Sequence, residues 1–497
     1  MKKYSENERE AIASKEKNSQ SKKLPSSPVY RPQGRQVGIA AGGVPAIKTM
    51  LDTLGFSEAI NSSLQLFKFW QPYSEADHVL SMGLNPLFGG RTLDDIEDRR
   101  TDEAMLTALG TAALPAPTTA GDFCRRFSEK DITALMDSVN EVRLKVWKKQ
   151  EPEFFDIARI DVDGVIVETG AECAEGVDYS YKGTWGYHPL IVSLANTQEP
   201  LYIVNRKGSR PSHEGASEWL DKGAVLCIAG GFRTVRFRGD TDFSQTKYLD
   251  KWDSKGYEFV FGIDAMPNLK AIASAVEENL WEPCLRESQP VDEEDERQGQ
   301  VRHKRQMIAQ REFKHLELSE EHITEVNYKP GACEKAYRLV ILRKLIHVHK
   351  GERMLFPETR YHFYISNVKN CTAREIVKEA NDRCNQENLN SHLKVGVHAL
   401  RAPLKTLDSN WAYMVMTSLA WTFKAWFALL APVEKETAFR DKAIRKRLLT
   451  MEFRTFLNKL MMIPCLVIRT CRQVHLRLLT STKWSAHFLR ISQSLRE

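Results

Sequence analysis

Cysteine is sparse in this chain, and its spacing does not suit metal or redox chemistry. Nine cysteines are distributed over 497 residues, and no two form a Cys-x-x-Cys pair. This argues against a zinc ribbon and, with no secretory leader, predicts a reducing cytoplasmic setting. Long uncharged hydrophobic runs are also missing. The nearest candidate, residues 411–432, is interrupted by Lys424, so we expect a buried helix and no membrane partner.

Neither sign of charge dominates the whole chain. The net charge is +6, from 71 Lys and Arg against 65 Asp and Glu, so the position of the charges says more than their sum. Both ends are basic: residues 1–36 hold nine Lys or Arg against four Asp or Glu, and residues 440–497 hold thirteen against three. Such ends fit an acidic partner such as nucleic acid, and a solubilising role is the alternative.

The N-terminal third divides into an arm and a helical region. Residues 1–36 have little to bury and are expected to be a disordered basic arm. Residues 37–150 show short helical patterns cut by Gly-Gly and Pro-rich breaks, which we interpret as a helical DNA-binding domain. The best helix-turn-helix candidate places Arg125 and Arg126 in the first turns of a helix that follows a Pro-rich turn. A small helical bundle that binds nothing is the alternative.

From residue 151 the pattern indicates an α/β core. Strands are expected over residues 154–167, 188–195, 200–208, 234–240 and 257–265, with helices over residues 212–230 and 243–256. Three hairpin-connected strands followed by helix, strand, helix and strand predict a mixed sheet with a parallel half, which is the order of a ribonuclease H-like core. We assign residues 151–266 to its first part and residues 371–432 to its second.

Acidic residues stand at the ends of two of these strands. Asp161 and Asp163 leave the same face of the first strand, and Asp163 lies nearer its end. We favour Asp163 as a metal ligand, with Asp161 as its competitor. Asp240 ends a strand expected to pair beside the first, whereas Asp242 is expected to cap the helix that begins at Phe243. Buried, hydrogen-bonded carboxylates at strand ends are the alternative.

A third acid, Glu387, lies in a helix predicted over residues 372–394, which opens with a Thr-x-x-Glu capping box. Arg383 and Lys394 stand four residues before it and seven after it, on the same face. A solvated surface network is the alternative. However, a helix used only for packing would show a cleaner apolar stripe. The amides around Glu387 are Asn381, Asn385, Gln386, Asn388 and Asn390.

Together, Asp163, Asp240 and Glu387 predict a site for two divalent cations. Mg²⁺ prefers oxygen ligands and keeps part of its water shell for a substrate phosphate. Two such ions activate water for in-line attack at phosphorus and stabilise the leaving oxygen, which is the chemistry of phosphodiester cleavage and joining. We therefore expect Mg²⁺ as cofactor, with Mn²⁺ able to substitute.

These motifs resemble those of a known family. IDVDGV around Asp163, RGDTDF around Asp240 and the Arg-x3-Glu-x6-Lys spacing of Arg383, Glu387 and Lys394 resemble the DDE transposases of bacterial insertion sequences, most closely the insertion-sequence 1380 family. The resemblance covers about residues 43–430. One departure is Ala380, where the signature usually has a Tyr that contacts phosphate.

The resemblance implies several further features. An inserted, mainly β subdomain is expected over residues 267–370, followed after the core by a basic helical region over residues 433–497. Arg383 and Lys394 would contact the DNA backbone near the scissile phosphate, and the loop bearing Arg206, Lys207 and Arg210 is expected to be exposed and to line the groove. Trp252 and Trp281 are candidates for stacking on a flipped base, with a buried core position as the alternative.

The function implied is that of a transposase that binds terminal inverted repeats, cleaves double-stranded DNA there and joins the ends to target DNA as a homodimeric synaptic complex. It would act in the bacterial cytoplasm, on nucleoid DNA. Three alternatives remain: a ribonuclease H-like nuclease without joining activity, a domesticated DNA-binding protein without catalysis, and a glycosidase. The last would need an aromatic sugar cleft beside its carboxylates.

Overall fold

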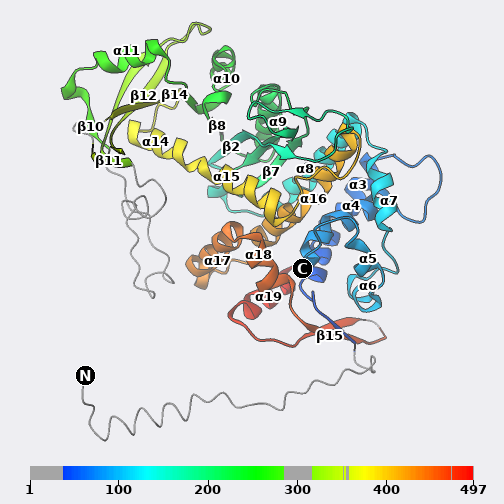
Figure 1. Cartoon of the computed structure of the whole chain (residues 1–497). Helices are drawn as coiled ribbons and strands as arrows, with labels where there is room; N and C mark the ends of the chain where they lie inside the picture. The colour runs from blue at the N-terminus through cyan, green and yellow to red at the C-terminus, as the bar shows by residue number, and fades with distance from the viewer. Residues whose placement is uncertain (1–36, 285–315, 351, 354–357, 472, 496–497) are drawn as a thin grey trace, which may run out of the picture.

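The computed structural model describes residues 37–284, 316–350, 352–353, 358–471 and 473–495. The predicted disordered arm, residues 1–36, lies outside these residues. The N-terminal region begins with a short strand and continues as a group of helices (Figure 1). These elements are β1 (Val37–Ile39), α2 (Val44–Thr53), α3 (Phe56–Ser63), α4 (Glu75–Leu84), η1 (Asn85–Phe88), α5 (Ile96–Arg100), α6 (Glu103–Leu109), α7 (Pro117–Cys124), α8 (Glu129–Trp147) and η2 (Pro152–Phe155).

Helix α4 shows how the local sequence positions this region. Ser74 caps the helix in a capping box with Asp77, which satisfies backbone groups that would otherwise lack partners. At Gly83 the helix packs closely against α16 (Leu407–Leu429), and a Cβ there would lie 3.1 Å from Cε2 of Phe423. A larger residue would therefore push the two helices apart, because interiors are closely packed.

Helix α16 is the buried axis of the molecule. Nearly all of its residues are buried, and α4, α8, β7 (Glu199–Val204) and α17 (Ala438–Thr450) pack against it. The buried helix expected over residues 411–432 is confirmed. In the described part of the chain, no helix is both long enough and apolar enough to span a bilayer.

The central element is a large mixed sheet. Its core strands and the helices between them are β2 (Ile157–Gly164), β6 (Leu190–Leu194), β7 (Glu199–Val204), α9 (Ala216–Ala229), β8 (Thr234–Gly239), η3 (Thr241–Phe243), η4 (Thr246–Tyr248), α10 (Leu249–Ser254) and β9 (Glu258–Ile263). The core strands are ordered β7-β6-β2-β8-β9. β2, β8 and β9 run parallel to one another, whereas β6 and β7 pair antiparallel. The predicted mixed α/β fold with a parallel half is therefore confirmed.

The two faces of this sheet are covered differently because strand side chains alternate. Ile160 faces α9, where Gly223 allows close approach. Asp161 and Asp163 point to the opposite face, which is covered by α14 (Ala373–Asp382) and α15 (Cys384–Ser391). A small second sheet lies at the end of β2 and comprises β3 (Val167–Glu168), β4 (Asp178–Tyr179) and β5 (Trp185–Tyr187), in the order β3-β5-β4.

Beyond β9 the chain extends the same sheet. The added elements are α11 (Pro267–Ala275), η5 (Glu278–Leu280), β10 (Glu282–Pro283), β11 (Leu316–Tyr328), β12 (Tyr337–Lys350), β13 (Glu352–Arg353) and β14 (Glu358–Ser366). β14 pairs antiparallel with β9, so these strands continue the core sheet directly. The expected β-rich content after residue 266 thus occurs as long strands joined to the core edge.

The C-terminal region contains strands as well as helices. Its elements are η7 (Lys435–Thr437), α17 (Ala438–Thr450), α18 (Phe453–Phe456), η8 (Leu457–Met461), β15 (Cys465–Arg469), β16 (Val474–Leu478) and α19 (Lys483–Ser494). β15 and β16 form a hairpin, and β1 pairs with β15, so the two ends of the described chain share a sheet. The predicted basic helical region did not include this hairpin, which pairs with the distant β1.

Candidate active site

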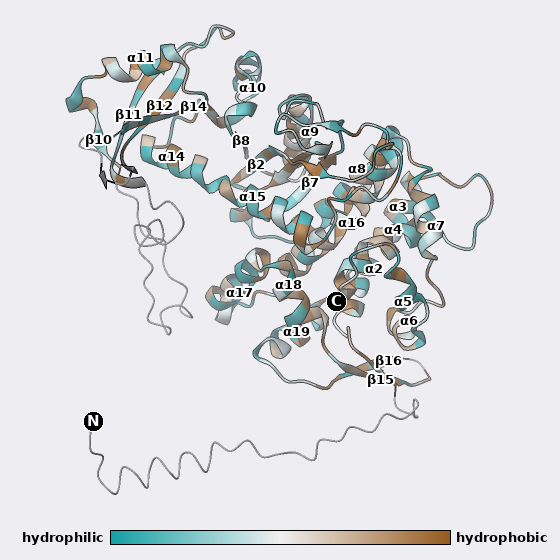
Figure 2. Cartoon of the chain, viewed as in Figure 1, coloured by the Kyte–Doolittle hydropathy of each residue, from teal (hydrophilic) through white to brown (hydrophobic). Residues whose placement is uncertain are grey.

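The predicted helix over residues 372–394 is divided into three pieces. The capping box at its start is present, with Thr372 and Glu375 bonded reciprocally. α14 ends at Asp382, α15 begins at Cys384, and a π-helical turn, η6 (His392–Gly396), follows. Figure 1 shows α14 and α15 following one another across the sheet, and Figure 2 shows α15 as predominantly hydrophilic. The break at Arg383 gives each helix its own contact with the sheet.

Asp163 and Asp240 lie at the same edge of the sheet. Asp163 is the last residue but one of β2, and Asp240 follows β8 directly. These strands are parallel neighbours in which Asp161 pairs in register with Arg238. Their carboxyl ends therefore meet at one edge, as the strand pairing predicted from the sequence requires. The Asp240 carboxylate also accepts a 3.0 Å bond from the backbone N–H of Asp242.

This bond overturns one sequence prediction. Asp242 does not cap a helix that begins at Phe243; instead, it lies inside the short helix η3, and Asp240 is the capping residue. A tight turn follows β8 directly, so the capping residue is Asp240, two residues before the predicted cap, Asp242.

A row of buried amides connects α15 to the carboxylate of Asp163. Asn390 Nδ2 donates a 2.8 Å hydrogen bond to Asp163 Oδ2. Gln386 Nε2 donates to Asn390 Oδ1 at 3.2 Å, and Ser193 on β6 donates to Gln386. These amides were predicted to cluster around Glu387, but Gln386 and Asn390 face the sheet, which was not predicted. Their spacing of four residues was the available signal.

Asp161 is fully engaged by an arginine. Arg238 Nε and Nη2 contact its two carboxylate oxygens at 2.6 and 2.8 Å, and both side chains are buried. Glu379 on α14 adds a second anion, which Arg159, Arg236 and Arg238 contact at 2.6, 3.3 and 3.2 Å. This buried cluster fixes α14 to the sheet, and it gives Asp161 a structural partner in place of a free coordination position.

Arg383 supplies the positive charge nearest the strand-end carboxylates. Burial raises the pKa of Asp163 to about 6; the Arg383 guanidinium opposes this, while Asp240 and Glu387 add to it. Burial also raises the pKa of Asp240, again opposed by Arg383, and Asp264 at the end of β9 adds to that increase. The site therefore concentrates negative charge in a partly desolvated place, which is the environment that attracts cations.

Glu387 lies on α15, the helix whose Asn390 is bonded to Asp163. Its side chain is 64% exposed, and its Oε1 lies 3.6 Å from Nη2 of Arg383. Nη1 of Arg383 is buried without a hydrogen-bond partner within the described residues. The structure thus brings Asp163, Asp240, Arg383 and Glu387 into one electrostatic neighbourhood.

The donor set suits a hard divalent cation, because all three side chains offer carboxylate oxygens. As folded here, however, no three acidic, His or Cys side chains of the described residues stand close enough together to form a metal centre. The two-ion site therefore stays a prediction.

The other predicted DNA contacts lie in two places. Lys394 Nζ donates to the carbonyl of Ile166 at 3.2 Å, just beyond β2. Arg125 and Arg126 lie in the N-terminal helical region, and their predicted position was wrong. α7 ends at Cys124, so both residues follow the helix instead of lying in its first turns. Arg125 pairs with Asp122, and the Arg126 guanidinium lies 5.3 Å from the centre of the Phe67 ring.

The loop after β7 is only partly exposed. Lys207 and Arg210 are exposed as predicted, but Arg206 is buried and donates to the carbonyls of His188, Ser212 and Glu214. Its role in the loop is therefore structural, because backbone oxygens accept from its Nε and Nη1.

Both tryptophans considered for base stacking are buried. Trp252 is 1% exposed, and its indole N–H donates to Asp221. Trp281 is 7% exposed, and the guanidinium of Arg343 lies 4.3 Å from the centre of its ring. The alternative of a core position holds for each of them.

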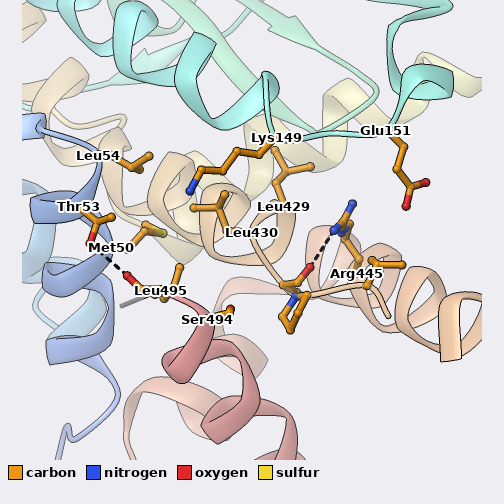
Figure 3. A pocket seen from close by; sticks show the side chains of 13 residues that line it. Met50, Thr53, Leu54, Lys149, Glu151, Leu429, Leu430, Arg445, Ser494 and Leu495 are labelled. Carbon is orange, nitrogen blue, oxygen red and sulfur yellow. Dashed lines mark hydrogen bonds between the residues drawn. The ribbon is translucent and has the colours of Figure 1, made fainter. Parts of the chain in front are cut away.

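A cavity of about 350 Å³ lies elsewhere, between α2, the ends of α16 and α19, and the start of η2 (Figure 3). Thr53 donates to the carbonyl of Leu495 and Arg445 to that of Ala431 across its walls. None of the strand-end carboxylates lines it. The cavity lies where α2 meets the C-terminal end of the described chain.

Comparison with known proteins identifies the class. A family model described as transposase DDE domain group 1 matches residues 29–497. The chain belongs to this family of DDE transposases. No curated protein matches it. Among solved structures it is similar to a piggyBac transposase in a synaptic complex with hairpin DNA, at 10% identity and a TM-score of 0.38, over 86% of this chain and 84% of that chain.

Proposed function

We propose that the chain is the transposase of a bacterial insertion sequence related to the insertion-sequence 1380 family. In this proposal it binds terminal inverted repeats, cleaves DNA at the element ends and joins them to target DNA. One observation carries it: in a DDE transposase family member, Asp163 and Asp240 share a sheet edge on which the helix bearing Arg383 and Glu387 is docked.

The proposed core is ribonuclease H-like. The order β7-β6-β2-β8-β9, with three parallel strands and an antiparallel hairpin, supports this assignment. The acids then lie where two parallel strands end, which is where open α/β sheets bind their ligands.

Asp163, Asp240 and Glu387 would hold two Mg²⁺ ions, and Mn²⁺ would substitute for them. When bound, such ions lower the pKa of a coordinated water and stabilise the leaving 3′ oxygen. The chain's own contribution is position and charge. Asn390 orients Asp163, and Asp161 and Glu379, through their arginines, hold α14 on the sheet. Arg383 lies 3.6 Å from Glu387, and Lys394 bonds to the backbone just beyond β2; both would contact the phosphates of a bound DNA backbone.

The reaction would consist of water attack that releases a 3′ hydroxyl, followed by attack of that hydroxyl on the target strand. Cutting at the two ends must be coordinated, so two protomers would pair two ends in a synaptic complex. The protein would act in the cytoplasm, on nucleoid DNA. Arg125 and Arg126 are exposed after α7 and would contribute DNA contacts remote from the cutting site.

The test uses labelled DNA that carries the element's terminal repeat, incubated with the full chain and Mg²⁺. Wild-type protein should cleave the DNA and produce joined product. Glu387→Gln and Asp240→Ala should bind the same DNA but neither cleave nor join it, whereas Glu436→Gln, in the short turn η7, should behave as wild type. Full activity of Glu387→Gln would refute the proposed site. Cleavage without joined product would favour a nuclease, and wild-type binding without cleavage would favour a domesticated DNA-binding protein.

A further inference from the structure

An exposed aromatic turn lies beside the carboxylates and has no part in the cleavage chemistry. This turn, residues 179–185, joins β4 to β5 and is called here the Tyr181 hairpin. The side chains of Tyr179 and Tyr181 are 63% and 68% exposed. The Lys182 ammonium lies 5.3 Å from the centre of the Tyr181 ring. Large aromatic side chains at this exposure leave considerable apolar surface in water.

The turn holds these rings in a defined direction. Ser180 and Thr184 are bonded across it, with the Ser180 N–H donating to the Thr184 carbonyl at 2.8 Å. The Gly183 N–H donates to the Ser180 carbonyl at 2.8 Å, and Gly183 has φ of +73°, which favours glycine. Tyr179 also packs edge-on against Trp185, with ring centres 5.0 Å apart. The exposed rings are therefore presented by an ordered turn.

One buried side chain connects the hairpin to the end of β2. His188 is 1% exposed, and the centre of its ring lies 6.0 Å from that of Tyr181. A Cβ on Gly164 would lie 2.7 Å from Nε2 of His188, so this imidazole packs directly on the residue after Asp163. The hairpin consequently stands at the sheet edge that carries the acids.

Three cations, Lys182, Lys207 and Arg210, lie around the hairpin, together with two acids: Arg210 pairs with Glu214 at 3.6 Å, and Lys207 lies near Asp178. Lys207 is exposed, and its backbone forms an isolated antiparallel β-bridge with Tyr187 at the end of β5. The Arg210 side chain is 49% exposed, and its carbonyl oxygen lies 2.8 Å from Nδ1 of His188. With Lys182, these cations give an aromatic surface with a basic rim, next to a cluster of carboxylates.

We propose that the Tyr181 hairpin binds unpaired nucleotides of the DNA, with bases stacked on Tyr181 and Tyr179 and phosphates facing Lys182, Lys207 and Arg210. This inference rests on the proposed function, because it assumes that DNA reaches the neighbouring carboxylates. Bases inside a duplex have their faces covered by stacking, so exposed rings select nucleotides that have left the stack. Stacking on aromatic side chains tolerates any base, and the basic rim follows the backbone.

The test measures binding of the full chain to two probes, a short oligothymidine and a blunt duplex of arbitrary sequence, with chelator present to prevent cleavage. Tyr181→Ala should bind oligothymidine at least about fivefold more weakly than wild type, whereas duplex binding should be unchanged. Tyr181→Trp should retain binding to both probes. The matched control is Phe439→Ala, which removes a 91% exposed ring from α17 and should change neither affinity.

Several outcomes would overturn the inference. The inference is wrong if Tyr181→Ala binds oligothymidine as wild type does, or if it loses affinity equally for both probes. It is also wrong if the wild-type protein binds no oligothymidine. Because the ring is exposed, thermal unfolding of Tyr181→Ala should match wild type. Mg²⁺-dependent cleavage of terminal-repeat DNA is measured separately. If wild type cleaves this DNA and Tyr181→Ala binds oligothymidine normally, only the role of the hairpin is refuted. If wild type does not cleave this DNA, the proposed function is refuted.

Discussion

The side-chain amide of Asn390 donates a 2.8 Å hydrogen bond to the carboxylate of Asp163, which lies 227 residues earlier in the chain. This bond joins α15 to the end of β2, and Asn390 is itself held by Gln386. Asp163 therefore has its orientation set by the helix that carries Glu387. The donor that joins strand and helix is a neutral amide.

Replacing Asn390 should damage catalysis more than folding. In Asn390→Ala the Asp163 carboxylate loses its orienting donor, and we expect Mg²⁺-dependent cleavage to fall about 10- to 100-fold, as misplaced catalytic groups typically cause. Single-turnover cleavage of terminal-repeat DNA measures this. Asn388→Ala, at an exposed position on the same helix, is the control and should cleave normally. An Asn390→Ala enzyme with normal single-turnover rates would show that the bond has no catalytic importance.

Glu379 should be important for stability. Its removal in Glu379→Gln takes the shared anion from the buried Arg236 and Arg238 and from Arg159, which is 34% exposed, so we expect a loss of up to about 3–5 kcal/mol. Urea denaturation, monitored by tryptophan fluorescence, should show the loss. Glu358→Gln removes one partner of an exposed pair with Arg360 and should cost less than about 1 kcal/mol. Equal effects of the two substitutions would contradict the structural role assigned to the cluster.

Lys424 should make stability depend on pH. Burial in the middle of α16 lowers its pKa to about 7, while its Nζ donates to the Leu449 carbonyl and lies 3.9 Å from the centre of the Trp421 ring. The unfolded chain keeps this proton up to the ordinary pKa of 10.5, so the unfolded state binds more protons between these values. Stability should therefore rise as pH increases from about 7 towards 10.

Lys424→Met tests this dependence. At pH 7 the variant should be about 1–3 kcal/mol more stable than wild type, because the cost of burying an ammonium group is removed. The gain should shrink at higher pH, where wild-type Lys424 is already neutral. Thermal melts across that range provide the measurement, with Lys459→Met as an exposed control. A gain that does not change with pH would attribute the effect to packing alone.

Divalent cations should stabilise the folded chain through the strand-end acids. With Mn²⁺ at 100 times its Kd, one site contributes about 2.7 kcal/mol, which appears as a higher melting temperature. Asp163→Asn and Asp240→Asn should each lose most of this increase, since each removes a ligand charge. Asp382→Asn, which lies just before the break between α14 and α15, should retain it. An undiminished Mn²⁺ effect in both strand-end variants would place the ions elsewhere.

Local sequence determined much of this fold. The alternation in residues 154–167 gave β2, and the Thr372–Glu375 capping box set the start of α14. Such features depend on backbone propensity and on neighbouring side chains only. The positions of Asp163 and Asp240 near strand ends followed from the same patterns, and parallel pairing of adjacent strands brought them to one edge.

Tertiary structure alone decided which polar groups have partners. Asp161 and Asp163 are two residues apart on one face, but one binds Arg238 and the other Asn390. The same applies to Arg206, which looks like an exposed loop cation in the sequence and is buried among backbone carbonyls. Sequence patterns determine the type of secondary structure and the face from which each side chain projects. The choice of partner depends on contacts between segments far apart in the chain, whose free energy is gained only when the sheet and its helices assemble.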